Sequence, residues 1–88
     1  MMFFRDHLNE KLKDPEFKKI YEEEKRLLDL GYAILKAREK KGLSQKELAK
    51  QCQVTQQQLS KIENGVNCNM LTFIKVSSAL GLGITVSA

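Results

Sequence analysis

Four polar side chains lie at helical spacing in the middle of the chain, and their chemistry suits a nucleic acid. They are Gln56, Gln57, Ser60 and Lys61. Glutamine can pair bidentately with adenine in the major groove of DNA, and lysine can reach guanine O6 and N7 or a phosphate. We therefore expect double-stranded DNA as the partner, with Gln56, Gln57 and Lys61 contacting bases.

Two short helices joined by a tight corner are needed to position these side chains. Ser44 can cap the first helix, and Glu47 follows it at the spacing of a capping box. Thr55 and Gln58 repeat that spacing at the start of the second helix. The pattern predicts a helix–corner–helix unit over residues 43–65.

The apolar residues of this unit predict which faces are buried. The inner faces would hold Leu48, Ala49, Cys52, Leu59 and Ile62, and the pair Asn64-Gly65 would end the second helix. Ala49 is small, as required where two helices cross closely. The polar residues of the second helix are then left on its outer face.

At these residues the chain resembles the phage-repressor-like (Cro/cI-type, XRE) helix-turn-helix family. The resemblance covers roughly residues 30–82, and it is carried by Gln45, Leu48, Ala49, Cys52, Val54, Leu59, Ile62 and Glu63-Asn64-Gly65. It implies an all-α fold: a lambda-repressor-like helix-turn-helix bundle, here with an N-terminal helical arm and a short C-terminal β-strand.

The same resemblance implies roles for individual residues. Gln56, Gln57 and Lys61 would face bases, and the phosphate contacts would come from Ser44, Gln45, Thr55, Ser60 and Asn64. Arg38 and Glu63 would form a structural ion pair. The chain departs from the family at Gln53, where a glycine is usual at the corner, so the corner is expected to be strained or differently shaped.

The charge of the chain is unevenly distributed. Residues 1–29 hold seven Lys/Arg and eight Asp/Glu, a net −1, whereas residues 30–88 hold eight and three, a net +5. A positive field on the helix-turn-helix part favours phosphate attraction. A solvated lysine-rich surface would give the same count, so the charge supports DNA only together with the motif.

Composition argues against several other classes of protein. No apolar run approaches the roughly 18 residues of a membrane span, and the N-terminus lacks a signal-peptide pattern, so we expect a cytoplasmic protein without a membrane partner. Cys52 and Cys68 fit neither a metal site nor a disulfide in a reducing compartment. With His7 as the only histidine, we expect no enzyme, no metal and no cofactor. RNA binding is less favoured, because Tyr32 and Phe73 are the only aromatic residues of the basic half.

The remaining segments predict further helices and one strand. Phe4, Leu8 and Leu12 indicate an amphipathic helix over residues 3–13, and Asp14-Pro15 begins a second helix that runs to residue 41, with a bend possible at Gly31. The last helix offers Leu71, Ile74, Val76 and Leu80 to the core, while Phe73 could be internal or face a partner. Ile84 and Val86 alternate as in a strand, which would need a second copy or another protein to pair with; a frayed terminus is the alternative.

These elements divide the chain into three parts: an arm over residues 1–29, a DNA-binding domain over 30–82 and a strand over 83–88. The arm segment LKDPEFKKIYEEE, followed by a repressor-like domain, resembles the HigA-type antitoxins of bacterial toxin–antitoxin pairs. That resemblance implies a homodimer that represses its own operator and neutralises a RelE/HigB-like ribonuclease. Toxin contacts would come from Phe4, Leu8, Leu12, Phe17, Tyr21, Glu22, Glu23 and Glu24.

Two alternatives to toxin binding remain open from the sequence. The apolar face of the arm can fold back on its own domain, and adjacent glutamates can be a solvated helix face. The alternative function is a stand-alone transcription regulator without a toxin partner, in which the arm is an oligomerisation element or packs on its own core.

Overall fold

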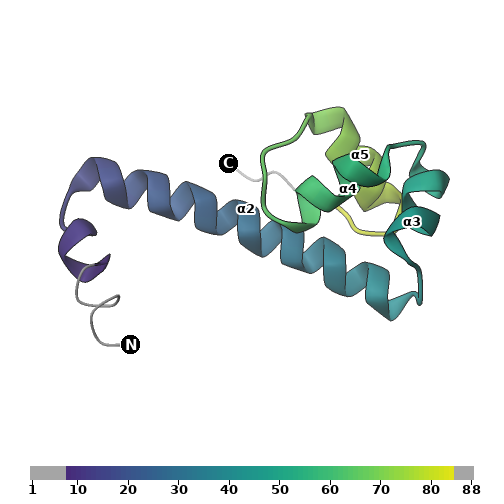
Figure 1. Ribbon diagram of the computed structural model, residues 1–88, viewed down its shortest axis with the longest axis horizontal. Coiled ribbons are helices and arrows are strands. Elements are labelled where there is room, and N and C mark those ends of the chain that lie inside the picture. The colour runs from purple at the N-terminus through teal and green to yellow at the C-terminus, as the bar shows by residue number, and fades with distance from the viewer. Residues whose placement is uncertain (1–7, 85–88) are drawn as a thin grey trace.

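The computed structural model describes residues 8–84, which form helices joined by short loops (Figure 1). Its helices are α2 (Pro15–Lys40), α3 (Gln45–Cys52), α4 (Gln56–Glu63) and α5 (Met70–Ala79), preceded by a helical turn at residues 8–11. The three short helices gather against the C-terminal half of α2, and the N-terminal half of α2 projects away from them (Figure 1). No helix in this part of the chain has the length and apolar character needed to cross a membrane.

The long helix α2 begins and ends where the sequence predicts. The Asp14 carboxylate caps it by accepting a hydrogen bond from the backbone N–H of Glu16 at 3.0 Å, and Pro15 occupies the first turn. At the other end, Gly42 has a φ of 70°, a conformation that glycine adopts without strain. Since α2 is unbroken from Pro15 to Lys40, it runs continuously from the arm into the bundle.

The core lies between the C-terminal half of α2 and the three short helices. Its buried apolar residues come from all four helices and from the residue that follows α5: Ile34, Leu48, Ala49, Cys52, Leu59, Ile62, Val76 and Leu80. Full burial of a Leu, Ile or Val side chain stabilises a fold by about 1.5–3 kcal/mol. This cluster therefore supplies most of the burial that fixes α3 and α4 on α2.

The prediction for α5 is wrong at two of its four core positions. Leu71 and Ile74 are 59% and 41% exposed, whereas Val76 and Leu80 are buried as expected. The buried stripe of α5 instead runs through Phe73, Val76, Ser77 and Leu80, which follow the i, i+3, i+4, i+7 spacing of one helix face. Leu71 and Ile74 lie outside that stripe.

The two ends of the chain differ from the prediction or lie outside the described residues. Of the helix predicted over residues 3–13, the structure describes only residues 8 onward, where 8–11 are helical; Phe4 lies outside. The strand predicted over residues 83–88 is not observed at Gly83 and Ile84, which have no regular structure, and residues 85–88 lie outside.

Gly31 is the point of closest approach between α2 and α4. A Cβ atom at this position would lie 2.2 Å from the backbone oxygen of Ile62 and 3.1 Å from that of Glu63. These are backbone atoms at the end of α4, so they cannot rotate away. Glycine is therefore required here for the close contact, and α2 continues through it without a break.

This contact gives a prediction opposite to that of helix propensity. In an ordinary helix interior, Gly→Ala gains about 1 kcal/mol. We expect Gly31→Ala to lower the free energy of unfolding by about 1–3 kcal/mol instead, because the added methyl group overpacks the contact. Chemical denaturation measures the change. Gly83→Ala is the matched control, since a Cβ there meets nothing within 4 Å; stabilisation of the Gly31 variant would contradict the close approach.

Candidate nucleic-acid interface

Both short helices of the predicted motif are capped as their sequences indicate. The backbone N–H of Glu47 donates to Ser44 Oγ at 3.1 Å, and Glu47 Oε1 accepts from the N–H of Ser44 at 3.1 Å, which lowers the pKa of Glu47. Thr55 and Gln58 repeat the arrangement at 3.0 and 2.9 Å. Each capping hydroxyl accepts a hydrogen bond and still has its O–H to donate, as a phosphate contact requires.

The corner between α3 and α4 is formed by a strained residue. Gln53 has φ 58° and ψ 41°, the left-handed conformation, and among residues 8–84 it is the only non-glycine residue with positive φ. A side chain in this conformation costs roughly 1–2 kcal/mol. Of the two outcomes expected for a missing corner glycine, the structure has the strained one, and the corner keeps a left-handed turn.

The outer face of α4 forms one side of a shallow polar hollow. Its lining consists of Gln45, Gln56, Gln57, Ser60, Lys61, Asn64 and Val66. Gln56, Gln57 and Lys61, the predicted base-contacting residues, are all exposed there. The structure thus brings them together with three of the predicted phosphate-contacting residues. Ser44 and Thr55 cap the helices outside this lining.

Val66 is a lining residue that sequence reasoning missed. It follows Gly65, whose φ of 74° turns the chain away from α4, and its backbone N–H donates to the carbonyl of Lys61 at 2.9 Å. Asn64, on the other side of Gly65, donates from Nδ2 to the Ser60 carbonyl at 2.8 Å, which fixes the amide over the last turn of α4. An apolar residue after the ENG end gives no polar signal that could have marked it.

The hollow is supported from below by a hydrogen-bonded carboxylate. Glu63 accepts from Arg38 Nε at 2.8 Å, from Arg38 Nη2 at 3.0 Å and from Gln45 Nε2 at 3.0 Å. Arg38 also donates from Nη1 to the Leu43 carbonyl at 2.8 Å. The Glu63 side chain is 4% exposed, and its hydrogen bond raises the pKa of Arg38. The pair joins α2, α3 and α4.

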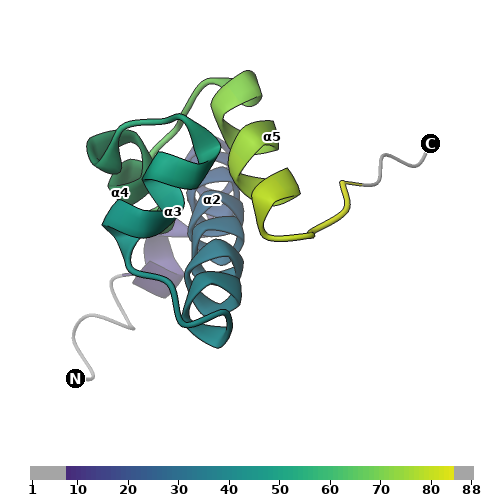
Figure 2. The same cartoon turned by 90° about the vertical axis from the view of Figure 1, so that its right-hand side faces the viewer.

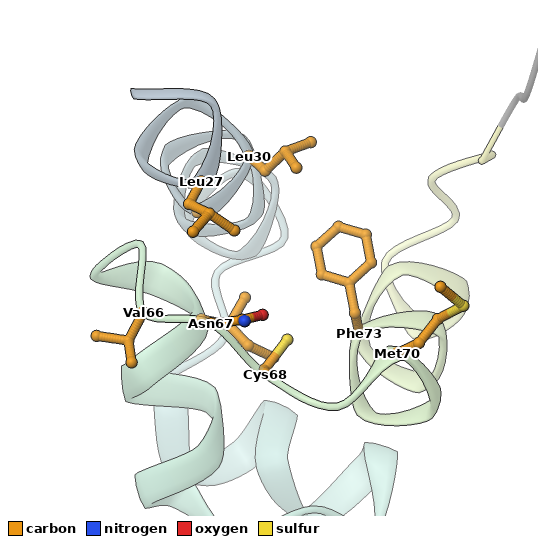
Figure 3. Close-up of a pocket in the computed structure, with 9 residues that line it drawn as sticks. Leu27, Leu30, Val66, Asn67, Cys68, Met70 and Phe73 are labelled. Carbon is orange, nitrogen blue, oxygen red and sulfur yellow. The ribbon is translucent and has the colours of Figure 1, made fainter. Parts of the chain in front are cut away.

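A second hollow, of about 210 Å³, is apolar and lies between α2 and α5. Figure 3 shows Leu27 and Leu30 projecting from α2, Phe73 projecting toward them from α5, and Cys68 on the connecting loop. Met70 at its rim is 77% exposed. Phe73, left open by the sequence, both packs against the core and lines this hollow.

The arm residues predicted to bind a toxin have different environments. Leu8, Leu12 and Phe17 are half-buried, and the Lys11 ammonium lies 5.5 Å from the Phe17 ring centroid, which brings the turn at 8–11 against the start of α2. The remaining described members, Tyr21, Glu22, Glu23 and Glu24, are exposed. The arm therefore covers part of its own apolar face.

Neither metal binding nor thiol chemistry is indicated in the described residues. Among residues 8–84, no three His, Cys, Asp or Glu side chains lie close enough to hold a metal ion. Cys52 and Cys68 are both free thiols, and burial raises the pKa of each. A raised pKa keeps a thiol protonated and poorly nucleophilic at neutral pH.

Comparison with known proteins identifies the family. The HTH_3 family of helix-turn-helix domains matches residues 34–86, more than half of the chain. This chain belongs to that family, and its matched region contains α3, the Gln53 corner and α4. The family assignment makes it a DNA-binding transcription regulator of the XRE-like helix-turn-helix class. Comparison with curated proteins gives no match.

The Arg38–Glu63 pair yields a stability prediction. Arg38→Ala leaves the Glu63 carboxylate nearly buried with one hydrogen bond, from Gln45, so we expect a loss of about 3 kcal/mol in the free energy of unfolding. Glu63→Gln combined with Arg38→Ala should cost less than the sum of the two single changes. A double-mutant cycle by chemical denaturation measures this coupling, and additive losses would show that the pair is energetically independent.

Proposed function

We propose that this chain is a sequence-specific repressor that binds an operator as a homodimer and is the antitoxin of a toxin–antitoxin pair. The observation that carries the DNA-binding part is the polar hollow, where Gln56, Gln57 and Lys61 are exposed on one face of α4. A helix presenting these side chains can enter the major groove and read base edges, while Gln45 and Asn64 at the margins contact phosphates.

A homodimer would recognise a longer stretch of DNA than one copy can. Two copies related by a two-fold axis would place their α4 helices about 34 Å apart, one turn of the duplex, and would read a near-palindrome. The apolar hollow and the exposed side chains of Met70, Leu71 and Ile74 support a contact between copies, since exposed apolar groups on α5 are stabilised by mutual burial.

Base reading by α4 is tested by substitution at its exposed glutamines. We expect Gln57→Ala, and separately Gln56→Ala, to lose roughly 1–3 kcal/mol of binding free energy at one base position and little elsewhere. The wild-type chain is first used to select a duplex site from a random library. The binding free energies of the wild type and of each variant are then measured on that site and on every single base-pair variant of it. Gln51→Ala is the matched control, because Gln51 is exposed on α3 outside the hollow.

Two results would count against this reading. Equal penalties across all base positions for the Gln56 and Gln57 variants would mean that these residues contact only the backbone. A wild-type chain that enriches no sequence from the library would remove specific DNA binding altogether.

The antitoxin part is supported by the exposed acidic turn of α2. Glu22, Glu23 and Glu24 lie on the half of α2 that projects from the bundle, where a basic protein can approach them (Figure 1). Such a partner would be a small RelE/HigB-like ribonuclease, which the complex would inhibit. The alternative, a stand-alone regulator, is favoured by the half-burial of Leu8, Leu12 and Phe17 within the arm.

Co-purification with the protein encoded by the neighbouring reading frame separates these two functions. We expect a stable complex that blocks RNA cleavage by the partner. Substituting Gln for Glu22, Glu23 and Glu24 together should slow association roughly tenfold at low salt, because steering by these charges is lost. Glu39→Gln is the control on the same helix. Absence of any complex would leave the stand-alone regulator.

A further inference from the structure

The two sides of α2 face different parts of the molecule. Leu27 and Leu30 line the apolar hollow together with Phe73 of α5. Leu28 instead lies against Gly65: a Cβ atom added to Gly65 would be 2.7 Å from Leu28 Cδ2. Gly65 lies between Asn64, which lines the polar hollow, and Val66, which lines both hollows. In Figure 2, α4 lies to the left of α2 and α5 to the right. Leu28 thus lies beside the loop that borders the polar hollow.

Helical periodicity places a row of cationic and aromatic side chains on that side. Steps of three or four residues from Leu28 reach Tyr21, Lys25, Tyr32 and Lys36, and one further turn reaches Lys18. All are exposed: Tyr32 is 58% and Tyr21 37% exposed. We call this row the α2 stripe, with the six members Lys18, Tyr21, Lys25, Leu28, Tyr32 and Lys36.

Part of the α2 stripe is ordered by its own contacts. The Lys36 ammonium lies 5.3 Å from the Tyr32 ring centroid, one helical turn away. This cation–π contact holds the ammonium beside the phenol ring, so a positive charge and a hydroxyl donor point to solvent together. Acidic side chains also lie on or beside this side: Glu39 one turn beyond Lys36, Glu24 one turn before Leu28, and Asp29 one turn after Lys25.

We propose that the α2 stripe is a second contact surface for the same duplex, and that it binds the sugar–phosphate backbone beside the groove occupied by α4. Lys25 and Lys36 would contact phosphates as cations, and the Tyr32 hydroxyl would donate to a phosphate oxygen. From Lys18 to Lys36 the stripe extends about 27 Å, which covers many phosphates of a duplex. The inference rests on the proposed DNA binding and extends its footprint onto the arm.

The salt dependence of binding to a mixed-sequence duplex tests the inference. Each lost phosphate contact lowers the slope of log K against log salt by about 0.9, so Lys25→Gln/Lys36→Gln should lower it by about 1.8. Arg26→Gln/Lys75→Gln removes the same charge from exposed positions off the stripe, on α2 and α5, and should change the slope much less. Tyr32→Phe keeps the ring and should weaken binding roughly twofold to tenfold, as expected for one lost hydrogen bond.

The outcomes separate this inference from the proposed function. If the wild-type chain binds no duplex, DNA binding itself fails. If the wild type binds but both double variants lower the slope equally, the lysines act only through net charge and the α2 stripe is not a contact surface. Loss of a co-purified protein partner in the Lys25/Lys36 variant, with DNA binding unchanged, would assign the stripe to that partner and overturn the inference.

Discussion

The carboxylate of Glu63 is the group on which the placement of the other site residues depends. It ends α4, receives Arg38 from α2 and Gln45 from the first turn of α3, and through Arg38 is linked to the Leu43 carbonyl. A carboxylate this well buried is destabilising unless its partners are all present. These bonds link the three helices, and the arrangement that they join sets the direction in which α4 presents its glutamines.

Local signals in the sequence accounted for most of the helix-turn-helix unit. The Asp14-Pro15 start of α2 and the caps at Ser44 and Thr55 are made by side chains within three residues of the groups that they satisfy. Capping hydrogen bonds of this kind join residues that are close in sequence, so the sequence pattern alone predicts them. The Arg38–Glu63 pair spans 25 residues and could be expected only from the resemblance to a family.

Features decided by packing between helices were not predictable in the same way. Leu71 and Ile74 are as apolar as the buried residues of α5, and the packing of α5 against the other helices determines that Phe73, Val76 and Ser77 face inward. The division expected between residues 29 and 30 falls inside α2, which passes through it without a break. Sequence periodicity likewise could not tell which side of α2 adjoins the polar hollow, because that depends on the contact of Leu28 with Gly65.

The close approach at Gly31 divides α2 into a part that projects from the bundle and a part that packs within it. The projecting part, from Pro15 to Gly31, is about 24 Å of continuous helix. The packed part ends in the turn that carries Arg38. Between the two parts, Gly31 lies against the last backbone carbonyls of α4. The part of α2 that projects from the bundle is thus joined, through backbone contact at Gly31, to the C-terminal turn of the helix that carries Gln57.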